Sequence, residues 1–349
     1  MMVVRVGIVD LISTRPDSMT RRVFLEAIAG AAAHVGTAGS AHSGTARSAH
    51  FGTAGSAHLS TAGSAHLSTV GGEFQSPVVL TEFPMENPVL VESTVFGIDP
   101  MGPTDAVDWP SLASMDALII SGSEPKAAEI ALEPSLIIID RILRECAAAT
   151  SLLFSCQSAH AALHLLHGLP RHRRPRRQHG VFTHEAHANE LTAGITGPAL
   201  VPHSRWNAML SADLRAADVP ILLDSSEAEW HLATSPDGLR HVYLQGHPEY
   251  LPDTMAREYR RDLRRWIADP TLPFPDIPLG YFPTPTYQRL LAHAELVRTH
   301  RNPALLDDLV LPATHTDVAL DWSQHSQLFF ANWLRAVHDR CQAKTLLPA

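Results

Sequence analysis

The chain has 349 residues, enough to bury a substantial core as one large domain or as two smaller ones. Its formal net charge of −9 argues against a nucleic-acid-binding surface, and no apolar run approaches the roughly 20 residues that a membrane-spanning helix needs. Three cysteines do not make a disulfide framework. This favours a reducing compartment, and we expect a cytoplasmic protein.

The chain begins with an apolar run over residues 4–10 that predicts a strand, followed by a helix over residues 18–33. The pair Arg21-Arg22 also resembles a twin-arginine export signal. A strand precedes it and Glu26 interrupts the apolar region, so the helix is the favoured interpretation and the export signal the minor alternative.

Residues 36–67 repeat an octapeptide of the form GTAGSAHS. Gly, Ser, Thr and Ala dominate, and so little apolar bulk cannot offset the entropy of ordering a chain. We therefore predict a flexible surface insertion over residues 36–71. The recurring histidines are His42, His50, His58 and His66. Nothing in the repeat fixes a ligand geometry, so we predict no specific metal site.

After the repeat, short apolar runs alternate with helix-type segments. The predicted strands are residues 78–81, 117–121, 151–155, 221–224 and 241–245. The predicted helices are residues 134–149, 157–166, 253–267 and 326–339. Such alternation predicts an α/β fold with a doubly covered, mostly parallel sheet. In these folds the active site lies at the carboxyl ends of the strands.

Cys156 stands where an apolar strand-type run meets a helix-type run of small residues. This is the layout of a nucleophile elbow, in which a helix N-terminus favours the thiolate. The alternative is an inert core cysteine. Cys146 and Cys341 lack this setting, and we predict a core residue and a surface residue without a role, respectively.

Further along the chain, the sequence Gly-His-Pro-Glu-Tyr follows another predicted strand and contains His247 and Glu249. Because parallel strands end at the same edge of the sheet, we expect both side chains to lie near Cys156. Thiolate, imidazole and carboxylate together form a candidate triad for covalent catalysis.

Residues 171–177 are strongly basic. They fit either a solvated loop or an anion-recognising edge of the active site, whereas a nucleic-acid patch is the weakest interpretation for a chain of net negative charge.

With these pieces, the chain resembles the homoserine O-acyltransferases of the succinyltransferase type, as a divergent member. The matching motifs include residues 119–122, 155–158, 180–182, 202–205, 246–250, 258–262, 281–283 and 332–334. The resemblance implies a class I glutamine-amidotransferase-like (flavodoxin-like) fold. It also implies a single acyltransferase domain over residues 1–349, interrupted by the insertion at 36–71 and by a divergent stretch at 284–318.

The resemblance implies ping-pong acyl transfer, a role in amino-acid (methionine) biosynthesis, and succinyl- or acetyl-coenzyme A as co-substrate with no bound cofactor. Cys156 would be acylated, His247 would be the base, and Glu249 would orient the imidazole. Backbone N–H groups of Gln157 and Ser123 would form the oxyanion hole.

The resemblance also implies an amino-acid acceptor site. Arg261 would bind the substrate carboxylate, with Glu258 one helical turn before it. Ser204 and Arg205 form a second substrate-contacting piece. Arg177 stands where the family has a lysine. Lys126 occupies the position that separates acetyl from succinyl donors, where a cation suits a succinyl carboxylate or a coenzyme phosphate.

Besides Arg177 and Lys126, which stand where the family has a lysine and a Gly or Glu, the chain departs from the family pattern at two further places. Gln157-Ser158 replaces the usual Trp-Gly, and Trp206-Asn207-Ala208 replaces His-Thr-Glu. A glutamine amidotransferase or cysteine hydrolase on the same fold, or a non-catalytic homologue, therefore remain alternatives. The expected partners are small-molecule substrates, with no nucleic acid and no membrane, and a homodimer is left open.

Overall fold

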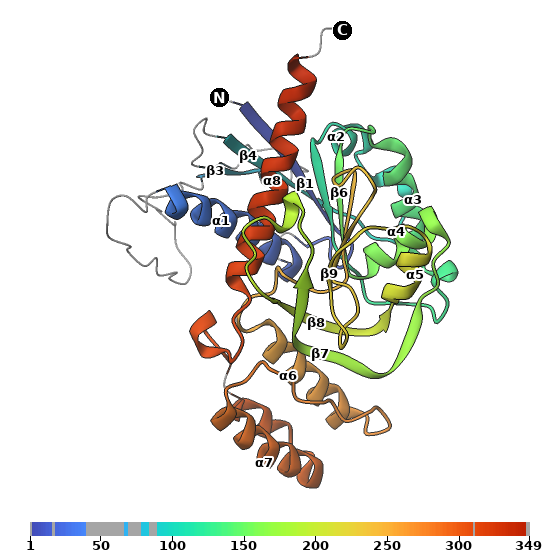
Figure 1. Ribbon diagram of the computed structural model, residues 1–349. Coiled ribbons are helices and arrows are strands. Elements are labelled where there is room, and N and C mark those ends of the chain that lie inside the picture. The colour runs from blue at the N-terminus through green and yellow to red at the C-terminus, as the bar shows by residue number, and fades with distance from the viewer. Residues whose placement is uncertain are drawn as a thin grey trace.

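The computed structural model describes residues 2–15, 18–39, 66–68, 78–83, 89–309 and 311–346. At its centre five parallel strands lie in the order β4-β1-β5-β6-β11 (Figure 1). They are β1 (Met2–Asp10), β4 (Val89–Gly97), β5 (Ala117–Ile120), β6 (Ser151–Ser155) and β11 (His241–Leu244). The predicted α/β fold with a parallel core is confirmed.

Antiparallel strands extend this sheet on both sides. Beyond β4 lie β3 (Val78–Phe83) and β2 (His66–Ser68). Beyond β11 lie, in order, β10 (Leu232–Thr234), β9 (Ile221–Asp224), β7 (His172–Ala186) and β8 (Ala199–Ala208). The sequence predicted β9 at its observed bounds but missed the long β7–β8 pair. The basic start and the proline of β7 hide its strand pattern.

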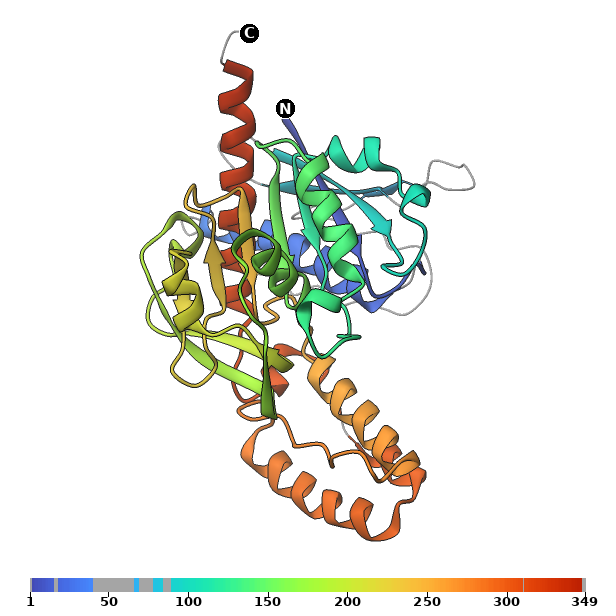
Figure 2. The same cartoon turned by 90° about the vertical axis from the view of Figure 1, so that its right-hand side faces the viewer.

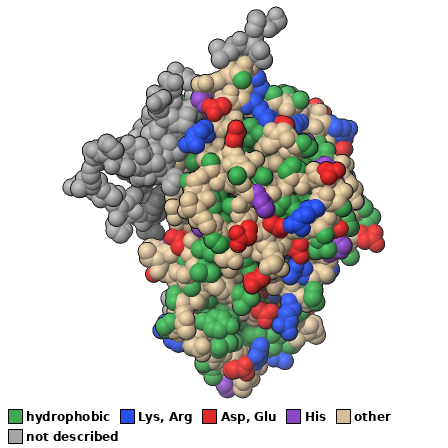
Figure 3. Space-filling model, viewed as in Figure 1, with side chains coloured by type: hydrophobic (Ala, Val, Ile, Leu, Met, Phe, Trp, Pro, Cys, Tyr) green, Lys and Arg blue, Asp and Glu red, His purple; other side chains and the backbone are tan. Residues whose placement is uncertain are grey.

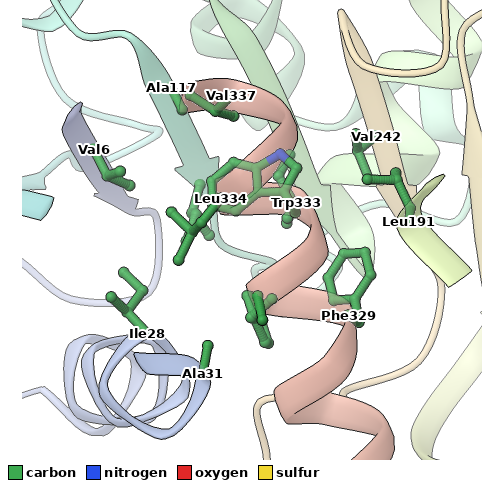
Figure 4. Close-up of a cluster of buried hydrophobic side chains, with 14 of the residues drawn as sticks. Val6, Ile28, Ala31, Ala117, Leu191, Val242, Phe329, Trp333, Leu334 and Val337 are labelled. Atoms are coloured by element: carbon green, nitrogen blue, oxygen red, sulfur yellow. The ribbon is translucent and has the colours of Figure 1, made fainter. Parts of the chain in front are cut away.

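Helices cover both faces of the parallel strands because side chains alternate along each strand. In β5, Ala117 and Ile119 face α1 (Met19–Gly39) and α8 (Ser323–Leu346), whereas Leu118 and Ile120 face the opposite cluster. That cluster includes α2 (Trp109–Ala113), α3 (Ser135–Glu145) and α4 (Gln157–His167). Figure 4 shows the first cluster, with Trp333 between α8 and the sheet. The indole of Trp333 donates to Ser151 Oγ at 3.0 Å, which anchors α8 to β6.

A third apolar cluster supports a helical extension below the sheet. It contains α6 (Thr254–Ala268) and α7 (Thr284–His300), which lie side by side in Figure 2. The divergent stretch 284–318 forms α7 and the short 3₁₀ helices Pro303–Asp308 and His315–Asp317. The remaining elements are α5 (Ser211–Ala216) and the 3₁₀ helices Thr104–Ala106, Ile130–Leu132 and Glu190–Thr192.

Several predictions about single segments have outcomes. The first helix runs to Gly39, past its predicted end at residue 33. Of the insertion predicted at 36–71, only residues 36–39, the end of α1, and the backbone of β2 are described. The rest, with His42, His50 and His58, lies outside the described residues. Cys146 is buried as predicted, but the prediction that Cys341 lies at the surface is wrong, because α8 packs it against the sheet.

Within the described ranges, no helix is long and apolar enough to cross a membrane. Figure 3 shows acidic and basic side chains interspersed over one face of the molecule.

Candidate active site

The turn from β6 into α4 places Cys156 in a strained backbone conformation. Its φ of 55° and ψ of −112° lie in a region that residues with a side chain rarely adopt. Two bonds hold the turn: Cys156 N donates to Leu244 O at 2.6 Å, and His160 N donates to Cys156 O at 3.1 Å. The strand-to-helix elbow that the sequence predicted is therefore present, with the thiol at the N-terminus of α4.

Gly122, after β5, lies directly against this elbow. A Cβ at Gly122 would lie 3.1 Å from Ser155 O, 3.3 Å from Cys156 Cβ and 3.4 Å from Gln157 N. The absence of that side chain leaves room beside the N–H of Gln157, which begins α4 and has no acceptor within the helix. Ser123 is the residue after Gly122, so the two predicted oxyanion donors belong to the segments that meet here.

His247 and Glu249 follow β11 and meet this thiol. His247 Nδ1 lies 2.9 Å from Glu249 Oε1, which also accepts a long bond from Ser155 Oγ at 3.4 Å. The backbone N–H of His247 donates to Pro202 O at 2.8 Å. Burial lowers the pKa of His247, but its charge interactions and hydrogen bonds with Cys156 and Glu249 outweigh burial and raise that pKa well above its ordinary value. This arrangement stabilises an imidazolium in contact with Cys156 and Glu249.

Three residues of the predicted acceptor site are in direct contact. Arg177 Nη2 donates to Ser204 Oγ at 2.6 Å and to Glu258 Oε2 at 3.1 Å. Ser204 Oγ in turn donates to Glu258, and Arg177 Nη1 donates to Asp262. β7, β8 and α6 therefore converge on one partly buried charged cluster.

Tyr250 joins this cluster to the candidate catalytic pair His247 and Glu249. Its ring stacks on His247 with centroids 4.3 Å apart, and its hydroxyl donates to Glu258 Oε1 at 3.0 Å. Burial raises the pKa of Glu258, but the contact with His179, whose Nε2 lies 3.6 Å from Glu258 Oε2, and the charge of Arg177 outweigh burial and hold that pKa well below its ordinary value. Sequence reasoning gave Tyr250, His179 and Asp262 no role, although Tyr250 and Asp262 stand inside the quoted motifs.

The two predicted substrate arginines differ in exposure. The Arg261 side chain on α6 is 46% exposed, and its Nε donates to Asp262 Oδ1 at 2.9 Å. Arg205 is only 4% exposed, and its Nη atoms donate to the carbonyls of Asn207 at 3.0 Å and Ala228 at 2.6 Å. Arg261 can receive a ligand directly, whereas a substrate contact by Arg205 stays a prediction.

The basic segment 171–177 could have been a solvated loop. It is not, because residues 172–177 form the start of strand β7. The Arg171 side chain is 1% exposed and pairs with Glu133 at 2.8 Å. It also donates to Gln157 Oε1 at 3.1 Å and to Ala127 O at 2.5 Å. Arg171 thus ties the loop after β5, which carries the exposed Lys126, to the elbow.

The departures from the family pattern have structural partners. Gln157 accepts the Arg171 bond, and Ser158 Oγ donates to the carbonyls of Ile120 at 2.8 Å and Ser155 at 2.9 Å. The Trp206 ring lies under the guanidinium of Arg173, with 4.5 Å between Cζ and the ring centroid. The changed residues therefore fit the fold around the elbow without disrupting it.

No group of three or more His, Cys, Asp or Glu side chains in the described part of the chain has the arrangement of a metal site.

Comparison with known proteins identifies relatives of this chain. The sequence pattern of the homoserine O-succinyltransferase family matches residues 109–342. A homoserine O-succinyltransferase of Methylorubrum extorquens is 36% identical over 230 residues, which are 65% of this chain and 70% of that protein. A homoserine O-succinyltransferase of Cardiobacterium hominis is 35% identical over 228 residues, which are 64% of this chain and 63% of that protein. The matched region thus spans about two thirds of the length of these relatives.

Solved structures with similarity include a protein of Thermoplasma acidophilum described as a GMP synthase component, with a TM-score of 0.41, 13% identity, and coverage of 71% of this chain and 85% of that chain. A glutamine amidotransferase of Thermotoga maritima has a TM-score of 0.39, 15% identity, and coverage of 70% and 86% respectively. The family assignment rests on the sequence matches: the chain belongs to the homoserine O-succinyltransferase family, a family of transferase enzymes.

Proposed function

We propose that this chain transfers a succinyl or acetyl group from coenzyme A to the hydroxyl of L-homoserine or a related hydroxy amino acid, through an acyl-Cys156 intermediate. One observation carries the proposal: the strained elbow holds Cys156 beside His247 and Glu249, and Tyr250 connects this pair to a charged cluster suited to an amino acid. The names of the relatives favour succinyl as the group transferred.

In the first half-reaction, the Cys156 thiolate attacks the carbonyl carbon of the acyl-coenzyme A thioester. The negative charge that develops on the carbonyl oxygen is stabilised by the N–H groups of Gln157 and Ser123. The C–S bond to coenzyme A then breaks, and the departing thiolate takes the proton from the His247 imidazolium. Acyl-Cys156 and neutral His247 remain.

In the second half-reaction, neutral His247 removes the proton from the acceptor hydroxyl as its oxygen attacks the Cys156 acyl carbon. The thiolate of Cys156 leaves as the new ester forms, and the imidazolium–thiolate pair is restored. Glu249, 2.9 Å from Nδ1, keeps the imidazole oriented in both steps.

The charged cluster provides complementary groups for an amino acid. The exposed guanidinium of Arg261 can bind the α-carboxylate in a bidentate geometry. Glu258, ionised because its pKa is lowered, attracts the α-ammonium, and Arg177 and Ser204 hold it in position. Lys126 in the exposed loop after β5 is a cation for a succinyl carboxylate or a coenzyme A phosphate.

The proposal is tested by following release of the coenzyme A thiol with succinyl- or acetyl-coenzyme A, in the presence and absence of L-homoserine. We expect acceptor-dependent release, with parallel double-reciprocal plots that indicate a ping-pong cycle. Cys156→Ser should abolish release, whereas Cys146→Ser, a buried thiol away from the site, should retain it. Ammonia release from glutamine without thiol release would instead assign an amidohydrolase, and neither activity would assign a non-catalytic homologue.

A further inference from the structure

Three histidines that the reaction does not use lie buried together beside the catalytic loop. His184 on β7, His203 on β8 and His231 just before β10 are each at most 2% exposed. The rings of His184 and His203 stack with centroids 5.0 Å apart, and His231 lies edge-on to both, at 5.8 Å and 6.0 Å.

The hydrogen bonds of this cluster fix the proton positions in two of its rings. Arg205 Nε, which can only donate, lies 3.3 Å from His203 Nδ1. Neutral His203 therefore carries its proton on Nε2 and donates to His184 Nε2 at 3.2 Å. His184 must then be protonated on Nδ1, and that atom lies 3.3 Å from the carbonyl of Phe182, which can only accept. The donor at one end of this series of hydrogen bonds, Arg205, and the acceptor at the other end, the carbonyl of Phe182, therefore require the same tautomers of His203 and His184.

The third ring holds the backbone that carries the catalytic base. Gly246 N donates to His231 Nδ1 at 3.1 Å, and Gln245 N donates to His231 O at 2.8 Å. A Cβ at Gly246 would lie 2.8 Å from His203 Nε2 and 2.8 Å from Pro202 O. The peptide that precedes His247 is therefore bonded to one ring of the cluster and packed against another.

We propose that His231, supported by His184, His203 and Arg205, is a positioning residue for His247. The three uncharged rings would form a platform that fixes the Gly246–His247 peptide, so that the imidazole faces Cys156. This inference rests on the proposed pairing of Cys156 with His247. It also gives the buried Arg205 a function: its Nε sets the tautomers of His203 and His184, while its Nη atoms bind backbone carbonyls.

Neutrality matters because a like charge beside His247 would oppose its imidazolium. Burial is the main cause that lowers the pKa of all three rings, to about 4 for His184 and well below the ordinary value for His203 and His231. Arg205 and the neighbouring histidines, His247 included, also lower the pKa of His203 and of His231. Asp224 on β9 acts in the opposite direction on His184 but does not outweigh burial. The three histidine rings of the platform therefore stay uncharged at neutral pH.

The test compares His231→Asn, which offers an oxygen near the position of Nδ1, with His231→Leu, which offers no acceptor. The readout is the pH profile of Cys156 alkylation by iodoacetamide, followed by peptide mass spectrometry, because this reaction requires the thiolate but neither substrate. At neutral pH we expect Cys156 in His231→Leu to be alkylated about tenfold more slowly than in wild type, with the midpoint of its pH profile at higher pH. The alkylation rate of His231→Asn should stay within about threefold of the wild-type rate. The kcat should follow the same order, with little change in KM.

His338→Leu and His338→Asn are matched controls, because His338 is a buried imidazole on α8 whose ring nitrogens bond to Asp339 and Gln342. Thermal unfolding of each variant measures the general cost of the substitution. Equal alkylation profiles for wild type, His231→Asn and His231→Leu would overturn the inference. Equal losses of alkylation rate in the two His231 variants would overturn it as well. If Cys156 of the wild type were alkylated only as slowly as a free cysteine thiol, that result would instead count against the proposed Cys156–His247 pair itself.

Discussion

The ring of Tyr250 stacks on His247 with an interplanar angle of 18°, while its hydroxyl donates to Glu258 Oε1 at 3.0 Å. One side chain therefore touches both the candidate base and the carboxylate proposed to receive the acceptor ammonium. The two halves of the site are thus connected through Tyr250, and a change at Glu258 should alter the position of the His247 ring.

Tyr250→Phe should weaken acceptor binding while it spares the stacking. Loss of the hydroxyl removes one donor from Glu258, a bond to a charged group worth about 1.5 kcal/mol, so we expect KM for the acceptor to rise about tenfold with a smaller change in kcat. Steady-state kinetics with varied acceptor measures both constants. Tyr259→Phe is the matched control, because the Tyr259 hydroxyl is buried without a partner among the described residues. A selective fall in kcat would contradict this division of roles.

Glu258→Gln should destabilise the protein in a pH-dependent way. The folded-state pKa of Glu258 lies below its unfolded value, so its contribution to the free energy of unfolding is present above the unfolded pKa, about 4.3. It is lost as the pH falls through the folded pKa. We expect a loss of about 2 kcal/mol at neutral pH, measured by denaturant unfolding, that shrinks at strongly acidic pH. A pH-independent loss would show that packing dominates.

His247→Asn should show the opposite pH dependence. The pKa of His247 is raised in the folded protein, so the stability that its charge contributes is fully present below the unfolded pKa, about 6.5. That contribution disappears as the pH rises through the raised folded value. The difference in thermal midpoint between wild type and His247→Asn should therefore be largest on the acid side and narrow in alkali. A gap that widens in alkali would mean that His247 is not stabilised as an imidazolium.

Arg171→Gln should release the loop after β5 from the elbow. Its guanidinium pairs with Glu133 at 2.8 Å and binds Gln157 and the carbonyl of Ala127, all away from solvent. Breaking a buried pair of this kind costs about 3–5 kcal/mol, and the freed loop carries Ser123 and Lys126. We expect lower stability and a raised KM for the acyl donor, with the KM for the acceptor less affected.

The control for this substitution is Arg144→Gln, which removes a solvent-exposed pair with Asp140 within α3. Such pairs contribute about 0.5 kcal/mol. Equal effects of the two substitutions on the donor KM would contradict the proposed role of Arg171.

Much of the candidate active site was predictable because it depends on local pattern and strand topology. Cys156 and His247 follow apolar runs, and those runs are the adjacent parallel strands β6 and β11, paired at Ser155 and Leu244. Parallel strands end at one edge, so their following residues must meet there.

Other parts of the site depend on contacts between distant segments, which leave no periodic signal. Arg171 lies in a basic run that fits a solvated loop, yet Glu133 and the carbonyl of Ala127 draw it fully inside. Arg205 resembles a substrate ligand by motif, but its side chain is buried and bonds to His203 Nδ1 and to the carbonyl of Ala228. The bulge between Arg173 and Gln178, which accompanies the turn of Arg177 toward α6, likewise has no signature in the sequence.

The account depends most on Cys156 as the residue that carries the acyl group. Incubation with succinyl-coenzyme A alone, followed by intact mass and peptide mapping, tests this directly. We predict one succinyl adduct on Cys156, lost when L-homoserine is added and not formed by Cys156→Ala. An adduct that maps elsewhere or persists with the acceptor, or turnover with no adduct on Cys156, would contradict the account.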